Sequence, residues 1–187
     1  MYPKFRTNQF SRPVQSKASR ATHQVQRIIR GFDDTELWDL DHTFIRYLVA
    51  ITPYLPKKPT REIMHLLERI QRGDHLSPQF IQPGFDPDWP QKANRRIWAF
   101  YLELALTDSA LAIHIADFVS PRLAAFAYSS DRGGPKSLSP CAWRALLLEA
   151  AAAFARLPDL SALSGHEKAR ALEQFEPFLE NVCALWS

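Results

Sequence analysis

Cysteine and glycine are scarce in this sequence, and their scarcity excludes several structural classes. The 187 residues include two cysteines, Cys141 and Cys183, with no CxxC pair and no His at metal-ligand spacing. This pattern excludes a disulfide framework and a zinc ribbon. Six glycines are present, and so few favour helices over sheets that need many tight turns.

Long uncharged apolar runs are also missing. No apolar stretch of membrane-spanning length lacks a charged residue, and the first residues lead into a polar segment instead of an apolar signal core. Both cysteines lie in apolar helical contexts, which is typical of reduced thiols in a cytosolic protein. We therefore expect a soluble, cytoplasmic protein that does not enter a membrane.

Acidic residues are absent from residues 1–32, which carry seven of the 23 Lys and Arg residues. The other residues hold 16 basic and 20 acidic side chains, so the body carries −4 although the whole chain carries +3. We expect residues 1–30 to form a basic, flexible arm with a short helix at 21–30, and residues 31–187 to form one domain. The arm residues that are candidates for contact with a macromolecule are Lys4, Arg6, Arg12, Lys17, Arg20, Arg27 and Arg30.

Apolar residues recur at intervals of three and four through the body, which predicts amphipathic helices. The predicted helices cover residues 34–52, 61–72, 92–106, 109–127, 140–156 and 165–185. N-cap residues or capping boxes precede most of them, at Asp33, Thr60, Asp108, Ser139 and Ser164. These patterns predict an all-α fold, an irregular bundle of six to seven helices with an extended N-terminal arm.

Prolines mark the expected interruptions of this pattern. Four prolines within residues 74–91 predict a loop in that segment. Pro121 and Pro177 lie inside predicted helices, and we expect each to kink or interrupt its helix.

Several short motifs follow one another in order along the chain. A Gly-aromatic-x-Asp turn at 31–34 leads into a Trp-x-Leu-Asp motif at 38–41. A Leu-Ser-Pro helix start at 138–140 is followed by Trp and Phe. The C-terminal helix ends in Leu185-Trp186. A Pro-Arg-Leu step lies between them, within 115–127. Together these motifs resemble an uncharacterised family of phage-encoded helical proteins. The resemblance implies a phage or prophage origin and a cytoplasmic location in the bacterial host, and it carries over no catalytic residues.

Catalytic and cofactor motifs are not found. The sequence has no G-x-S-x-G, no Walker motif and no G-x-G-x-x-G, so we expect neither catalytic residues nor a cofactor. Two carboxylate–His pairs at helical spacing, Asp39/His42 and Glu62/His65, are weak candidates for a metal site. Such pairs also arise by chance on exposed helix faces, and we expect no bound metal.

A further set of residues is considered for contact with a ligand or phosphate. Asp41 falls on the apolar stripe of its helix, where a carboxylate needs a partner such as Arg122 or Arg46. The Arg95-Arg96 pair lies close in sequence to aromatic residues that either stack a base or pack into the core. The complete set is Trp38, Asp41, Arg95, Arg96 and Arg122.

Three hypotheses for the function follow from these features. The leading one is a non-catalytic, phage-type accessory protein that binds a host or phage macromolecule, with a protein as the expected partner and inhibition of a host defence system as its sharpest form. The first alternative is nucleic-acid binding through the basic arm, which predicts steep salt dependence. The second alternative is a helical bundle that binds a small ligand or a metal.

Overall fold

Helices form all the regular secondary structure among the described residues of the computed structural model, which are 22, 25–26, 29–30, 32, 37, 40–72, 86, 88–129, 134–135 and 137–185. The predicted all-α fold is therefore confirmed. The α-helices are α3 (Leu40–Ile51), α4 (Arg61–Gln71), α5 (Trp89–Ala105), α6 (Ser109–Tyr128), α7 (Pro140–Ala155), α8 (Leu157–Ser161), α9 (Gly165–Glu173) and α10 (Glu176–Asn181). Two 3-10 helices, η2 (Thr52–Tyr54) and η5 (Val182–Leu185), follow α3 and α10.

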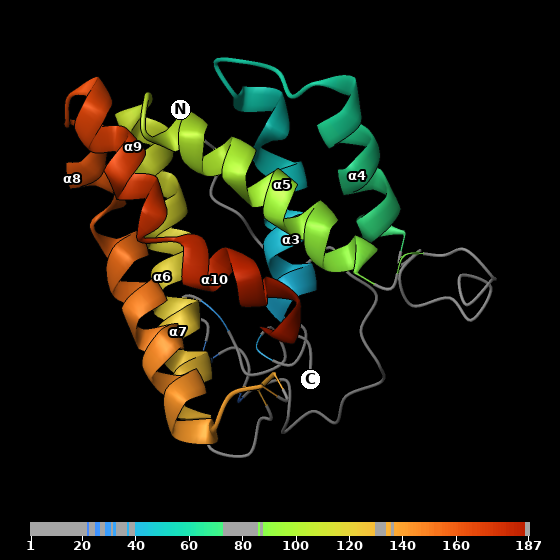
Figure 1. The fold of residues 1–187 in the computed structure, drawn as a ribbon, viewed down its shortest axis with the longest axis vertical. Helices are drawn as coiled ribbons and strands as arrows, with labels where there is room; N and C mark the ends of the chain where they lie inside the picture. The colour runs from blue at the N-terminus through green and yellow to red at the C-terminus, as the bar shows by residue number, and fades with distance from the viewer. Residues whose placement is uncertain are drawn as a thin grey trace.

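A crossing helix joins two antiparallel pairs of helices (Figure 1). α3 and α4 pack together and are linked by a short connector that begins with η2, and α6 and α7 pack together along their length. α5 runs between the pairs and contacts both α4 and α6. α10 and η5 then return across the bundle, where α10 contacts α5 and α7 and η5 contacts α3 and α5.

The Trp98 ring lies at the centre of an aromatic core built from four helices. It makes edge-to-face contacts with Phe44 of α3 at 5.6 Å, with Phe154 of α7 at 5.6 Å and with Phe178 of α10 at 5.5 Å between ring centroids. Such contacts contribute roughly 0.5–1.5 kcal/mol each beyond the burial of their area. Trp98 and Tyr101 are among the aromatic residues close in sequence to Arg95 and Arg96, and both are fully buried, so they pack into the core and do not stack a base.

Most helix starts follow the predicted caps. The side chains of Thr60, Asp108 and Ser139 accept hydrogen bonds from backbone amides two or three residues later, at 3.0 to 3.3 Å. At the start of α9, the Glu167 carboxylate accepts a hydrogen bond from the Ser164 amide at 3.0 Å, which completes the predicted capping box. These local contacts satisfy amides that a helix leaves without internal partners, so they fix where each helix begins.

The two helix-internal prolines have different effects. Pro177 separates α9 from α10, as predicted. Pro121 does not interrupt α6, which continues from Ser109 to Tyr128. Proline removes one internal hydrogen bond, and α6 nevertheless stays continuous where it packs closely against α7.

α6 is also long and apolar enough to cross a membrane by length and composition alone. More than half of its most apolar window is buried inside the bundle. The core helix of a soluble protein passes the same test, so this helix is weak evidence for a membrane span.

Several predictions concern residues outside the described part of the chain. These are the flexible arm before residue 22, the cap at Asp33 and the Pro-rich loop up to residue 85. The described residues between 22 and 30 are helical, in agreement with the short helix expected at 21–30. α5 begins at Trp89, three residues before the predicted start, because Pro90 suits the first turn of a helix.

Candidate functional site

Both arginines considered for a phosphate contact form ion pairs with neighbouring helices. Arg95 Nη2 lies 2.6 Å from Glu176 Oε2 on α10, and Arg96 Nη1 lies 2.5 Å from Glu62 Oε1 on α4. The four side chains are about half exposed. A phosphate at either arginine would compete with a carboxylate, so these charges are already used to hold α10 and α4 on α5.

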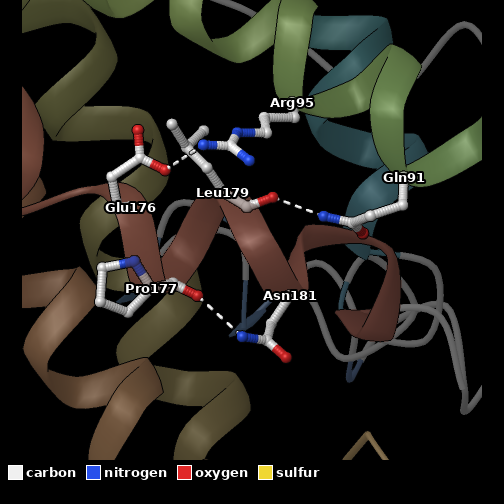
Figure 2. A network of polar contacts seen from close by, with 6 residues as sticks. All are labelled: Gln91, Arg95, Glu176, Pro177, Leu179 and Asn181. Carbon is white, nitrogen blue, oxygen red and sulfur yellow. Dashed lines mark hydrogen bonds and ion pairs between the residues drawn. The ribbon is translucent and has the colours of Figure 1, made fainter.

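Figure 2 shows that the Arg95–Glu176 pair belongs to a polar seam between α5 and α10. Gln91 Nε2 donates to the carbonyl oxygen of Leu179 at 2.5 Å, and Asn181 Nδ2 donates to the carbonyl oxygen of Pro177 at 2.9 Å. The Leu179 carbonyl of α10 is thus bonded to a side chain of α5, and the Pro177 carbonyl to a side chain of α10 itself. The seam fixes the register of the C-terminal segment on α5.

Asp41 lies beside a buried polar cluster where α3, α5 and η5 meet. Asp41 is 4% exposed and Asn94 of α5 is 2% exposed. Asn94 Nδ2 donates to Cys183 Sγ at 3.2 Å, while Asn94 Oδ1 is buried with no hydrogen-bond partner. Burial raises the pKa of Cys183 to about 11, against a smaller lowering by the Asn94 hydrogen bond, and the charge of Asp41 adds the smallest contribution, which also raises it. The Cys183 thiol is therefore held protonated and is a poor nucleophile near neutral pH.

Arg122 has a structural environment on α6. It is 5% exposed, its Nη1 donates to the carbonyl oxygen of Phe118 at 2.9 Å, and its guanidinium carbon lies 3.8 Å from the centroid of the Phe118 ring. The ring of Phe32, which belongs to the Gly-aromatic turn, lies 4.8 Å from the same carbon. Cation–π contact with two rings keeps this buried charge stable. Trp38, the neighbour of Asp41 in the sequence motif, lies outside the described residues.

The candidate metal ligands are not gathered into one site. Among the described residues, no group of three or more His, Cys, Asp or Glu side chains could hold a metal ion. Glu62 is paired with Arg96 and His65 is exposed, whereas His42 is buried on α3. Asp39 lies outside the described part of the chain.

A buried tyrosine–histidine contact escaped the sequence analysis. Tyr47 of α3 is fully buried, and its hydroxyl lies 2.6 Å from His114 Nδ1 and donates to the His114 carbonyl oxygen at 3.0 Å. The Tyr47 ring also stacks on Phe118 with 3.9 Å between centroids. The tautomer of His114 sets which partner donates in the 2.6 Å contact, since Nδ1 can either donate to the Tyr47 oxygen or accept its proton. The contact ties α3 to α6, and no sequence pattern signals it because the partners lie 67 positions apart.

Three cations on the connector between η2 and α4 and at the first residue of α4 were also missed. Lys57, Lys58 and Arg61, here named the basic corner, are exposed. No hydrogen bond or ion pair joins their side chains to any residue in the part of the chain that the structure describes. The segment Pro-Lys-Lys-Pro-Thr-Arg, residues 56–61, was a visible signal, but the sequence does not show which cations lack a partner.

A shallow depression of about 470 Å³ adjoins the basic corner. Lys57 lines it from the connector, and Thr107, Asp108 and Ser109 line it from the turn between α5 and α6. Asp108 directs its carboxylate to the first amides of α6, at 3.0 and 3.1 Å. The Asp108 carboxylate is thus partly compensated by these amides, and the three cations of the basic corner outnumber it.

The seven arm residues can be placed only in part, since the structure describes Arg30 alone among them and shows it exposed. Comparison of the chain with protein-family models, with curated proteins and with solved structures finds no match.

Proposed function

We propose that this chain is a non-catalytic protein that acts by binding an acidic macromolecule at the basic corner. One observation carries the proposal. Lys57, Lys58 and Arg61 lie within five residues and lack partners among the described residues, whereas Arg95 and Arg96 are neutralised by carboxylates. Like charges held together repel one another, so an unpaired cluster of this kind gains from an anionic partner.

The connector that carries these cations is suited to binding. Pro53, Pro56 and Pro59 recur at every third position, and each fixes one backbone angle. A segment whose backbone is already restricted loses less entropy when a partner binds. The basic residues within 1–32 would add long-range attraction to the same partner.

As part of this proposal, and in line with the motifs that resemble a phage family, the partner would be a macromolecule of a phage or of its bacterial host. An acidic protein of a defence system and a nucleic acid both present the negative charge that the basic corner requires. Binding of the first kind would make the chain an inhibitor, as the leading hypothesis states.

The test is a titration of the full chain with labelled polyanions at about 50 mM and 200 mM salt. The set includes polyglutamate, single-stranded DNA and RNA, and duplex DNA. We expect binding that weakens as salt rises and that is reduced in the double variant Lys57→Gln/Lys58→Gln. Lack of binding to every polyanion at the lower salt would rule the proposal out.

A further inference from the structure

We infer that the basic corner binds single-stranded nucleic acid, with Tyr54 as the stacking surface for a base and the three cations as contacts to neighbouring phosphates. The inference rests on the proposed function and names its partner class. It also places the contact on the helical body, separate from the arm.

The exposure of Tyr54 is the first observation behind this assignment. Tyr54 is 54% exposed at the end of η2, three residues before Lys57. Most large aromatic side chains that the structure describes are buried, and Tyr54 and Tyr128 are the large exposed exceptions. A ring that remains in water three residues before Lys57 offers a flat surface to a base, since every base has a π-face.

The spacing of charge and ring is the second observation. Lys57 and Lys58 lie on the short connector that follows Tyr54, and Arg61 is the first residue of α4. Single-strand sites combine a basic track for the backbone with an aromatic platform for bases. In this protein, the exposed Tyr54 ring and the basic corner lie within the eight residues 54–61, so one short segment carries both parts.

The ring also decides between candidate partners. Duplex DNA keeps its bases stacked on one another and offers no free base face to Tyr54, so it would use the cations alone. An acidic peptide would likewise pair with Lys57, Lys58 and Arg61, and its carboxylates would make no use of the exposed ring. Single-stranded nucleic acid is the partner that uses both features.

Tyr128 supplies a matched control for the ring. It is 67% exposed at the last position of α6, whereas the depression beside the basic corner includes Ser109, the first residue of that helix. A helix of this length separates the two ends by about 30 Å. Tyr128→Leu therefore removes an exposed ring far from the proposed site.

A second control matches the charge removed by Lys57→Gln/Lys58→Gln. Lys168 and Arg170 lie on α9, and no hydrogen bond or ion pair joins their side chains to the residues that the structure describes. The pair Lys168→Gln/Arg170→Gln removes the same net charge as Lys57→Gln/Lys58→Gln.

The experiment measures fluorescence anisotropy of a labelled 12-nucleotide oligothymidylate with the full chain and each variant. We expect Tyr54→Leu to weaken binding roughly 5- to 100-fold, the loss for one stacked base, with little effect on binding of a 12-base-pair duplex. Lys57→Gln/Lys58→Gln should lower the slope of log K against log salt by about 1.4, since each phosphate contact on a single strand contributes about 0.7. Both control variants should bind like the unmodified chain.

Three results would overturn the inference. In the first, Tyr54→Leu binds the oligonucleotide as tightly as the unmodified chain does. In the second, the arm variant Lys17→Gln/Arg20→Gln loses binding while the corner variant keeps it. In the third, polyglutamate binds better than the oligonucleotide, which identifies an acidic protein as the partner and leaves the proposed function standing. If none of the polyanions binds, both this inference and the proposed function are excluded.

Discussion

The Oε1 atom of Gln91 on α5 accepts a hydrogen bond from the backbone amide of Cys183 at 3.2 Å. The Nε2 atom of the same side chain donates to the carbonyl oxygen of Leu179. A continuous α-helix would join the Leu179 carbonyl to the Cys183 amide directly, because they lie four residues apart. Gln91 bridges these two groups, and the chain changes there from α10 to the 3-10 helix η5.

Replacing Gln91 should therefore loosen the C-terminal segment. Gln91→Ala leaves the Leu179 carbonyl and the Cys183 amide without their side-chain partner, and we expect a loss of about 1–3 kcal/mol in the free energy of unfolding. The free energy of unfolding is measured by urea denaturation that is monitored by far-UV circular dichroism. Gln174→Ala, which removes an exposed Gln bonded to Arg156, is the control and should change stability by less than about 0.5 kcal/mol. Equal effects from both variants would contradict the bridging role.

The two described glycines should respond in opposite ways to substitution by alanine. A Cβ atom on Gly134 would overlap the buried side chain of Trp143, whereas one on Gly165 would have no heavy atom within 4 Å. Gly134→Ala should destabilise the protein by about 1–3 kcal/mol through overpacking. Gly165→Ala should stabilise it by up to about 1 kcal/mol through helix propensity at the start of α9. Thermal unfolding of both variants tests the pair, and a stable Gly134→Ala protein would show that Trp143 moves freely.

The hydroxyl of Tyr101 makes the free energy of unfolding depend on pH in the alkaline range. Burial raises the pKa of Tyr101 to about 12 from 10.0, against a smaller lowering by its bond to Thr52. The folded state thus keeps the proton more tightly than the unfolded chain does. This contribution is fully present below pH 10 and is lost as pH rises toward 12.

Tyr101→Phe isolates this effect. Near pH 7 the variant should be less stable than the unmodified protein by about 1–2 kcal/mol, because it lacks the hydroxyl that donates to the Leu48 carbonyl oxygen. The difference in unfolding free energy between Tyr101→Phe and the unmodified protein should shrink between pH 10 and 12. Only the unmodified protein loses the contribution of the phenol in that range. Urea titrations at several alkaline pH values provide the measurement, and a constant difference would exclude the linkage.

The two cysteines should differ in reactivity. Cys141 is exposed on α7, while Cys183 is partly buried and has its pKa raised to about 11. A disulfide reagent such as DTNB at pH 8 should label Cys141 fast and Cys183 slowly, because the thiolate is the reacting form. In the Cys141→Ser variant, only the slow reaction should remain. A fast reaction of that variant would mean that the C-terminal segment opens readily.

Local patterns in the sequence predicted the secondary structure well. α4, α6 and α7 begin where Thr60, Asp108 and Ser139 mark their caps, since a cap depends on side chains and amides only two or three residues apart. The split at Pro177 follows from the missing amide proton of proline. The continuity of α6 through Pro121 could not be predicted in this way, because it depends on packing against α7.

The sequence by itself determined the helical class of this protein, the positions of its caps and the uneven distribution of its charge. All three depend on residues close together in the chain. Only the tertiary structure decided which charges are neutralised: Arg95 meets Glu176 across 81 positions, while Lys57 and Lys58 meet no such partner among the described residues. Ion pairing depends on distances of a few ångströms between helices, and the packing of the apolar faces sets those distances.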